Sequence, residues 1–151
     1  MIKLNVVIKY YLFLFLLIDA FSGFIRIYSG ITNPIFNVGF WIRGPILFLL
    51  FFYYIVQLKN KKIYFDEFLS LIIFGYFIFN LFLNYSISPS SRMITEHIPY
   101  VLRQQFLIFL LVYIRNRLII TEELVKKIVT INFTVLTLNL AIGYFLGFGL
   151  E

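Results

Sequence analysis

The sequence predicts an all-α fold, a polytopic bundle of about five transmembrane helices. Of the 151 residues, 62% are hydrophobic and 13% are charged, whereas soluble domains average roughly 45–50% apolar and 25% charged. The hydrophobic residues gather in five long runs, each close to the ~20 residues that cross a bilayer as a helix. Residues 46–56 are apolar throughout, without the period-two alternation of a membrane β-strand. These observations exclude a soluble domain and a β-barrel.

The five runs have recognisable boundaries. The first follows Lys3 and Lys9 as in a signal peptide, but no small-residue cleavage pattern comes after it, so we expect an uncleaved span. A lysine-rich tract separates the second run from the third. The fourth run is the shortest, so part of residues 99–105 must enter the membrane, with Pro99 in the first helical turn. The fifth begins after Thr121, where two glutamates favour a helix N-terminus. The predicted helices are residues 6–27, 38–57, 64–85, 98–114 and 124–148, in a single transmembrane domain at residues 1–151.

Basic residues set the expected orientation, because short cytoplasmic loops retain lysine and arginine during insertion. With the N-terminus inside, nine of the 13 basic residues fall on the inner side. These nine are Lys3, Lys9, Lys59, Lys61, Lys62, Arg115, Arg117, Lys126 and Lys127. The other four, all arginines, fall on the outer side: Arg26, Arg43, Arg92 and Arg103. We therefore predict an N-inside, C-outside topology.

The four outer arginines are the first candidate substrate-binding site. Arginine holds carboxylates and phosphates in a bidentate fork that lysine cannot reproduce; the alternative is that arginine merely tolerates the interface. With residue 98 at the outer edge, Arg103 lies roughly 7 Å deep and either snorkels outward or lines a cavity. Glu96 and His97 lie beside the same external mouth. They are expected there either as a general base or as a capping or ion-paired loop.

Polar residues on the first span are a second set of candidates. Asp19, Ser22, Gly23 and Arg26 recur at helical spacing, so their shared stripe should face protein rather than lipid. A carboxylate near the middle of a span costs ~2.5–3.5 kcal/mol on insertion scales. We therefore expect Asp19 to be a buried polar residue with a structural partner, in preference to a proton relay or a ligand.

Three further patterns predict packing or anchoring. Gly143 and Gly147 form a G-x-x-x-G sequence, which allows helices to approach closely. Aromatic residues near the span ends, Tyr54 among them, are expected as interfacial anchors. Residues 132–134, Asn-Phe-Thr, match a glycosylation acceptor but fall in or near a span, so we interpret the match as chance.

Composition also limits the chemistry. The chain has no cysteine and one histidine, so thiolate chemistry and a Cys- or His-rich metal site are not expected, and no cofactor is predicted. The net charge of +6 comes from residues scattered between apolar runs rather than from a solvated basic face. We therefore expect membrane lipid, and no nucleic acid, as a partner.

The chain loosely resembles bacterial O-antigen ligase and polymerase membrane proteins over its whole length, and its last 33 residues resemble them more closely. The resemblance is carried by residues 119–151, with the acidic-basic start EELVKK at residues 122–127 and the glycine-punctuated ending IGYFLGFG at residues 142–149. It implies a glycosyltransferase of the bacterial inner (plasma) membrane that uses an undecaprenyl-diphosphate-linked glycan in lipopolysaccharide or other surface-polysaccharide biosynthesis. It implies no metal. Members of the family are more than twice this length, and their principal arginines and histidine have no matching position here.

The expected function is therefore the N-terminal part of a cell-envelope polysaccharide polymerase or ligase, inactive by itself, with polysaccharide-assembly proteins as possible partners. Whether it polymerises or ligates, which sugar it uses and which linkage it forms are left open. The alternative is a complete small membrane protein, such as a lipid-carrier flippase, a transporter component or an assembly subunit.

Overall fold

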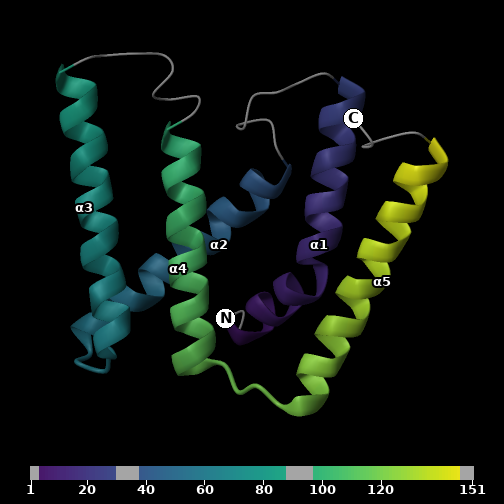
Figure 1. Cartoon of the computed structure of the whole chain (residues 1–151). Coiled ribbons are helices and arrows are strands. Elements are labelled where there is room, and N and C mark those ends of the chain that lie inside the picture. Colours follow the sequence, from purple (N-terminus) through teal and green to yellow (C-terminus); the bar gives the residue numbers. More distant parts are fainter. Residues whose placement is uncertain (1–3, 30–37, 88–96, 147–151) are drawn as a thin grey trace. The chain divides into compact units, whose positions relative to one another are not determined.

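The computed structural model describes residues 4–29, 38–87 and 97–146, and helix is the only regular secondary structure in these ranges. Figure 1 labels the helices and colours them along the sequence. They are α1 (Leu4–Ser29), α2 (Val38–Lys59), α3 (Phe65–Ile87), α4 (Ile98–Arg117) and α5 (Glu122–Leu146). Each is long and apolar enough to cross a membrane, which confirms the predicted all-α class and is typical of a multi-pass membrane protein.

The helix ends differ from the predicted boundaries by up to three residues. Helix α4 continues to Arg117 rather than residue 114, and both arginines of its last turn form ion pairs with α3. Helix α5 begins at Glu122, because the Thr121 hydroxyl accepts a hydrogen bond from the Leu124 amide at 3.2 Å. This N-cap confirms the start expected from the Thr-Glu-Glu sequence. Pro99 lies in the first turn of α4, also as expected.

The helices group into two compact units, which are described separately. The two-helix unit consists of α1 and α5, and the three-helix unit of α2, α3 and α4. In the two-helix unit, Asn132 near the middle of α5 bonds to Leu12 and Leu16 near the middle of α1. Both helices run in the same direction from that contact (Figure 1), as the first and fifth of five alternating membrane spans must.

The core of the three-helix unit is aromatic. Tyr54 of α2 is fully buried, stacks edge-on against Phe109 of α4 with ring centroids 5.2 Å apart, and donates a hydrogen bond to the Phe109 carbonyl at 2.8 Å. Phe74 of α3 packs against the same Phe109 ring at 5.7 Å. The expectation that Tyr54 is an interfacial anchor is therefore wrong: its hydroxyl finds a carbonyl inside the unit, where a buried tyrosine needs a partner.

Candidate functional site

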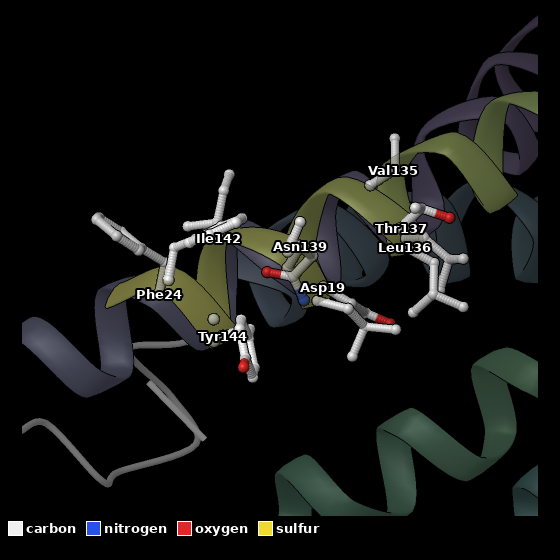
Figure 2. A pocket seen from close by; sticks show the side chains of 15 residues that line it. Asp19, Phe24, Val135, Leu136, Thr137, Asn139, Ile142 and Tyr144 are labelled. Carbon is white, nitrogen blue, oxygen red and sulfur yellow. The ribbon is translucent and has the colours of Figure 1, made fainter. Parts of the chain in front are cut away.

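A groove of about 960 Å³ runs between α1 and α5 of the two-helix unit, and it is the first candidate site. Its walls are mainly apolar, with the polar side chains of Asp19, Thr137, Asn139 and Tyr144 among them (Figure 2). Binding pockets typically combine an apolar lining with a few polar groups that orient the ligand. The groove has this composition.

Small residues on both helices keep the groove open. Ala20 and Gly23 line it from α1, and Ala141 and Gly143 line it from α5. A Cβ atom built on Gly23 would meet nothing within 4 Å, so this glycine borders open space. Gly143 of the predicted G-x-x-x-G therefore lies at the groove, whereas Gly147 lies outside the described residues.

The residues of the polar stripe predicted on the first span differ in their surroundings: Ser22 is buried, whereas Asp19 and Gly23 line the groove. Ser22 is buried and donates to the Ile18 carbonyl of its own helix at 2.7 Å. Asp19 lines the groove and is partly exposed, rather than buried as expected. An ionisable side chain within a span almost always faces protein or a water-filled cavity. The groove wall is such a position.

The described residues do not test the predicted arginine site. Arg26 lies in α1, in the two-helix unit, and its side chain is not among those described. Arg43 of α2 is partly exposed and Arg103 of α4 is exposed; both belong to the three-helix unit. Arg92 lies outside the described residues. The shared anionic site therefore stays a prediction.

Of the candidate acid–base pair Glu96 and His97, the structure describes only His97. His97 precedes α4 and is exposed, without a side-chain capping bond to the helix. Glu96 lies outside the described residues. The exposure of His97 fits both interpretations made from the sequence, the general base and the loop residue.

The sequence analysis missed a buried ion pair in the three-helix unit. The Glu67 side chain is fully buried, and Arg117 donates to both of its carboxylate oxygens, at 2.6 and 2.7 Å. Arg117 also donates to the Lys62 carbonyl at 2.7 Å, and its guanidinium lies over the Tyr64 ring at 4.4 Å. The end of α2, the start of α3 and the end of α4 therefore meet at one end of this unit. The signal that could have found the pair is Asp66-Glu67 at one helix start with Arg115 and Arg117 at the end of the next helix.

A second buried polar contact continues into the same unit. Gln105 of α4 is fully buried and donates to the Ser70 carbonyl of α3 at 3.1 Å, while the Ser70 hydroxyl donates to the Glu67 carbonyl at 2.7 Å. The Gln105 Oε1 atom is buried without a hydrogen-bond partner in the described structure. Side-chain bonds of this kind hold transmembrane helices together.

The α1–α5 groove and the buried Glu67–Arg117 pair differ in the space they leave for a ligand. No group of three His, Asp or Glu side chains that could hold a metal ion occurs among them. The Glu67 carboxylate is occupied by Arg117 and by the Tyr64 amide, which donates at 3.0 Å. The α1–α5 groove, in contrast, has both free volume and polar groups, so it has room for a ligand.

No protein-family model, no curated protein and no solved structure matches the chain. The resemblance to O-antigen ligases and polymerases therefore rests on the sequence features given above.

Proposed function

We propose that this chain contributes transmembrane helices to a bacterial inner-membrane polymerase or ligase that acts on undecaprenyl-diphosphate-linked polysaccharide, and that the α1–α5 groove holds the lipid carrier. The observation that carries the proposal is the groove itself: an elongated, largely apolar space on two helices that are long enough to span a membrane. A polyprenyl chain has the matching chemistry, being long, narrow and apolar.

The charges along α1 support an orientation for this lipid. Asp19 would repel a diphosphate at its own level in a medium of low dielectric constant. Arg26 lies seven residues further along α1, about 10 Å nearer the helix end. Arginine is the residue best suited to bidentate recognition of phosphate. In this proposal, the head group lies at the end of α1 and the polyprenyl chain extends past Gly23 toward Leu16.

Photocrosslinking of the purified chain in lipid nanodiscs tests the groove. A polyprenyl diphosphate with a benzophenone on its isoprenoid chain should label peptides of α1 and α5. Gly23→Leu should reduce this labelling by about tenfold or more, corresponding to ~1.4 kcal/mol of binding free energy, because the new side chain occupies the groove. The matched control is Gly75→Leu on α3, where an added Cβ also meets nothing within 4 Å. Equal labelling of both variants would contradict the proposal.

Three competitors identify which part of the ligand is recognised. Unlabelled polyprenyl diphosphate should compete best, the polyprenol less well, and a two-chain phospholipid least. A membrane-vesicle assay then separates polymerisation from transport. If Gly23→Leu abolishes movement of the lipid-linked glycan across the bilayer while glycan length is unaffected, the flippase alternative replaces the polymerase.

The predicted N-inside topology of the chain can be tested separately. Single-cysteine labelling is simple because the described chain has no cysteine of its own. An impermeant thiol reagent added to intact cells should label Ser90→Cys, which lies outside the described residues, and not Lys61→Cys. Lys61 lies in the turn after α2, at the same end of the three-helix unit as Arg117. The reverse labelling pattern would invert the topology and place the four arginines on the cytoplasmic side.

A further inference from the structure

The side-chain amide of Asn132 on α5 contacts the backbone of α1 through both of its polar atoms. Its Nδ2 donates to the Leu12 carbonyl at 2.9 Å, and its Oδ1 accepts a hydrogen bond from the Leu16 amide at 3.3 Å. The second Nδ2 proton is directed to the Ile128 carbonyl of its own helix, also at 2.9 Å. Asn132 is 5% exposed, so both donor protons and the acceptor are used inside the two-helix unit.

The two α1 groups that Asn132 contacts are partners of each other in a regular helix. In an α-helix the amide of residue i donates to the carbonyl of residue i−4, which here joins Leu16 to Leu12. The Asn132 amide offers one donor and one acceptor to this pair, the same two kinds of group that close one backbone bond. Insertion of a side chain into the helical hydrogen-bond ladder is a recognised cause of a sharp kink. Figure 1 shows the first, darkest part of α1 running at an angle to the rest of the helix.

This contact lies at one end of the groove. Leu16 is the groove-lining residue closest to the N-terminus, and Asp19 follows three residues later on the same helix. Asn132 precedes the first groove residue of α5, Val135, by three positions. The amide therefore joins α1 to α5 at the point from which the two walls of the groove extend.

We propose that Asn132 is a positioning residue, which bends α1 between Leu12 and Leu16 and fixes the separation of the groove walls. The part of this inference that concerns ligand binding rests on the proposed function, whereas the geometric part stands without it. In a lipid environment the exposed backbone groups of a kink need protein partners, and Asn132 supplies both. Without its amide, α1 closes its own ladder and the tie to α5 is lost.

Spin labels measure both consequences. Val6 and Val129 are exposed on the two helices before the groove, and a label pair at these positions follows the bent first part of α1. Phe21 and Leu138 are exposed beside the groove without lining it, and a second pair follows the separation of the walls. In Asn132→Leu, the Val6–Val129 distance should shift by several ångström, and the distribution of Phe21–Leu138 distances should broaden. Thr134→Val, which removes a hydrogen bond within α5, should change neither.

Proline provides a second arm that keeps the Asn132 side chain and its bond to the Leu12 carbonyl, whereas Leu16→Pro removes the amide from which Asn132 Oδ1 accepts. Proline lacks the backbone N–H and kinks a helix at the preceding turn. Leu16→Pro should retain the Val6–Val129 distance, because the helix is already bent there, whereas Leu14→Pro should shift it. In the double variant Asn132→Leu with Leu16→Pro, the Val6–Val129 distance should return to its wild-type value. The distribution of Phe21–Leu138 distances should stay broad. Equal shifts for the two single proline variants would overturn the proposal, even if Asn132→Leu fails to fold.

Crosslinking with the polyprenyl diphosphate probe distinguishes the positioning role of Asn132 from the proposed binding of a lipid carrier in the groove. Labelling of the groove should fall severalfold in Asn132→Leu and remain unchanged in Thr134→Val. If both label pairs respond as expected while the wild-type protein is not labelled by the probe, the lipid function fails and Asn132 remains the residue that sets the groove geometry. If neither distance responds to Asn132→Leu, the positioning role is wrong whatever the probe shows.

Discussion

The two-helix and three-helix units hold their helices together by different contacts. In the three-helix unit, rings and side chains fill the space between α2, α3 and α4, and a bidentate ion pair joins Glu67 to Arg117 at one end. In the two-helix unit, one asparagine side chain reaches from α5 to the α1 backbone, and a groove follows it. Glu67 forms its polar contacts with Tyr64, Ser70 and Arg117 of its own unit. Asp19 and Asn139, in contrast, line the groove.

This difference indicates that the two units have different roles: one is rigid and the other binds. Interhelical packing in lipid depends on close van der Waals contact and on hydrogen bonds rather than on the hydrophobic effect. The three-helix unit has both, so it is suited to act as a scaffold. The two-helix unit leaves part of its facing surfaces unfilled, as a binding region must. Three substitutions in the three-helix unit would test this interpretation.

The largest effect is expected for Arg117→Ala. The fully buried Glu67 carboxylate would lose its counter-charge, and removal of one partner of a buried ion pair typically costs ~3–5 kcal/mol. The free energy of unfolding in mixed micelles, measured by denaturing-detergent titration, should fall by about this amount. The matched control is Lys127→Ala, which breaks the exposed i,i+4 pair with Glu123 and should cause little change. A loss no larger than that of the control would show that Glu67–Arg117 does not stabilise the unit.

A smaller effect is expected for Tyr54→Phe. This change removes the hydroxyl that bonds to the Phe109 carbonyl but keeps the ring and its edge-on contact. A buried hydrogen bond of this kind contributes ~0.5–1.5 kcal/mol, so the free energy of unfolding should fall by about 1 kcal/mol. Tyr76→Phe on α3, where the side chain is exposed, should be neutral. If both variants unfold alike, ring packing alone holds α2 against α4.

The sequence predicted the five helices well because a hydrophobic run of membrane length is a local property. The helix ends were less accurate, since α4 ends at Arg117 through contacts with residues about 50 positions away in the chain. The Glu67–Arg117 pair was missed for the same reason: composition reports the charges, and only the packing of α3 against α4 brings them together.

The groove could be predicted only in part. Asp19, Gly23 and Gly143 were all singled out, yet their separate assignments, a buried carboxylate and a helix contact, did not show that the three residues share one open space. Asn132 was interpreted as a chance match to a glycosylation pattern. Its position within a span indicated a polar residue able to join helices, but its partner is the α1 backbone, which carries no residue-specific signal in the sequence.

The smallest effect is expected for Gln105→Leu, and it tests how completely the polar core of the three-helix unit is satisfied. Leucine removes the Gln105 bond to the Ser70 carbonyl, a loss of ~0.5–1.5 kcal/mol. It also removes the buried Oε1 atom, which lacks a partner in the described structure, and leaving such an atom unsatisfied costs ~1–3 kcal/mol. The two effects oppose each other, so the free energy of unfolding should stay within about 1 kcal/mol of the wild type or rise slightly. Gln105→Ala, which removes the same polar atoms but leaves a cavity, should be clearly less stable than Gln105→Leu. If leucine instead destabilises the protein as strongly as Arg117→Ala, the Oε1 atom has a bonding partner, and Gln105 contributes to the core through both ends of its amide.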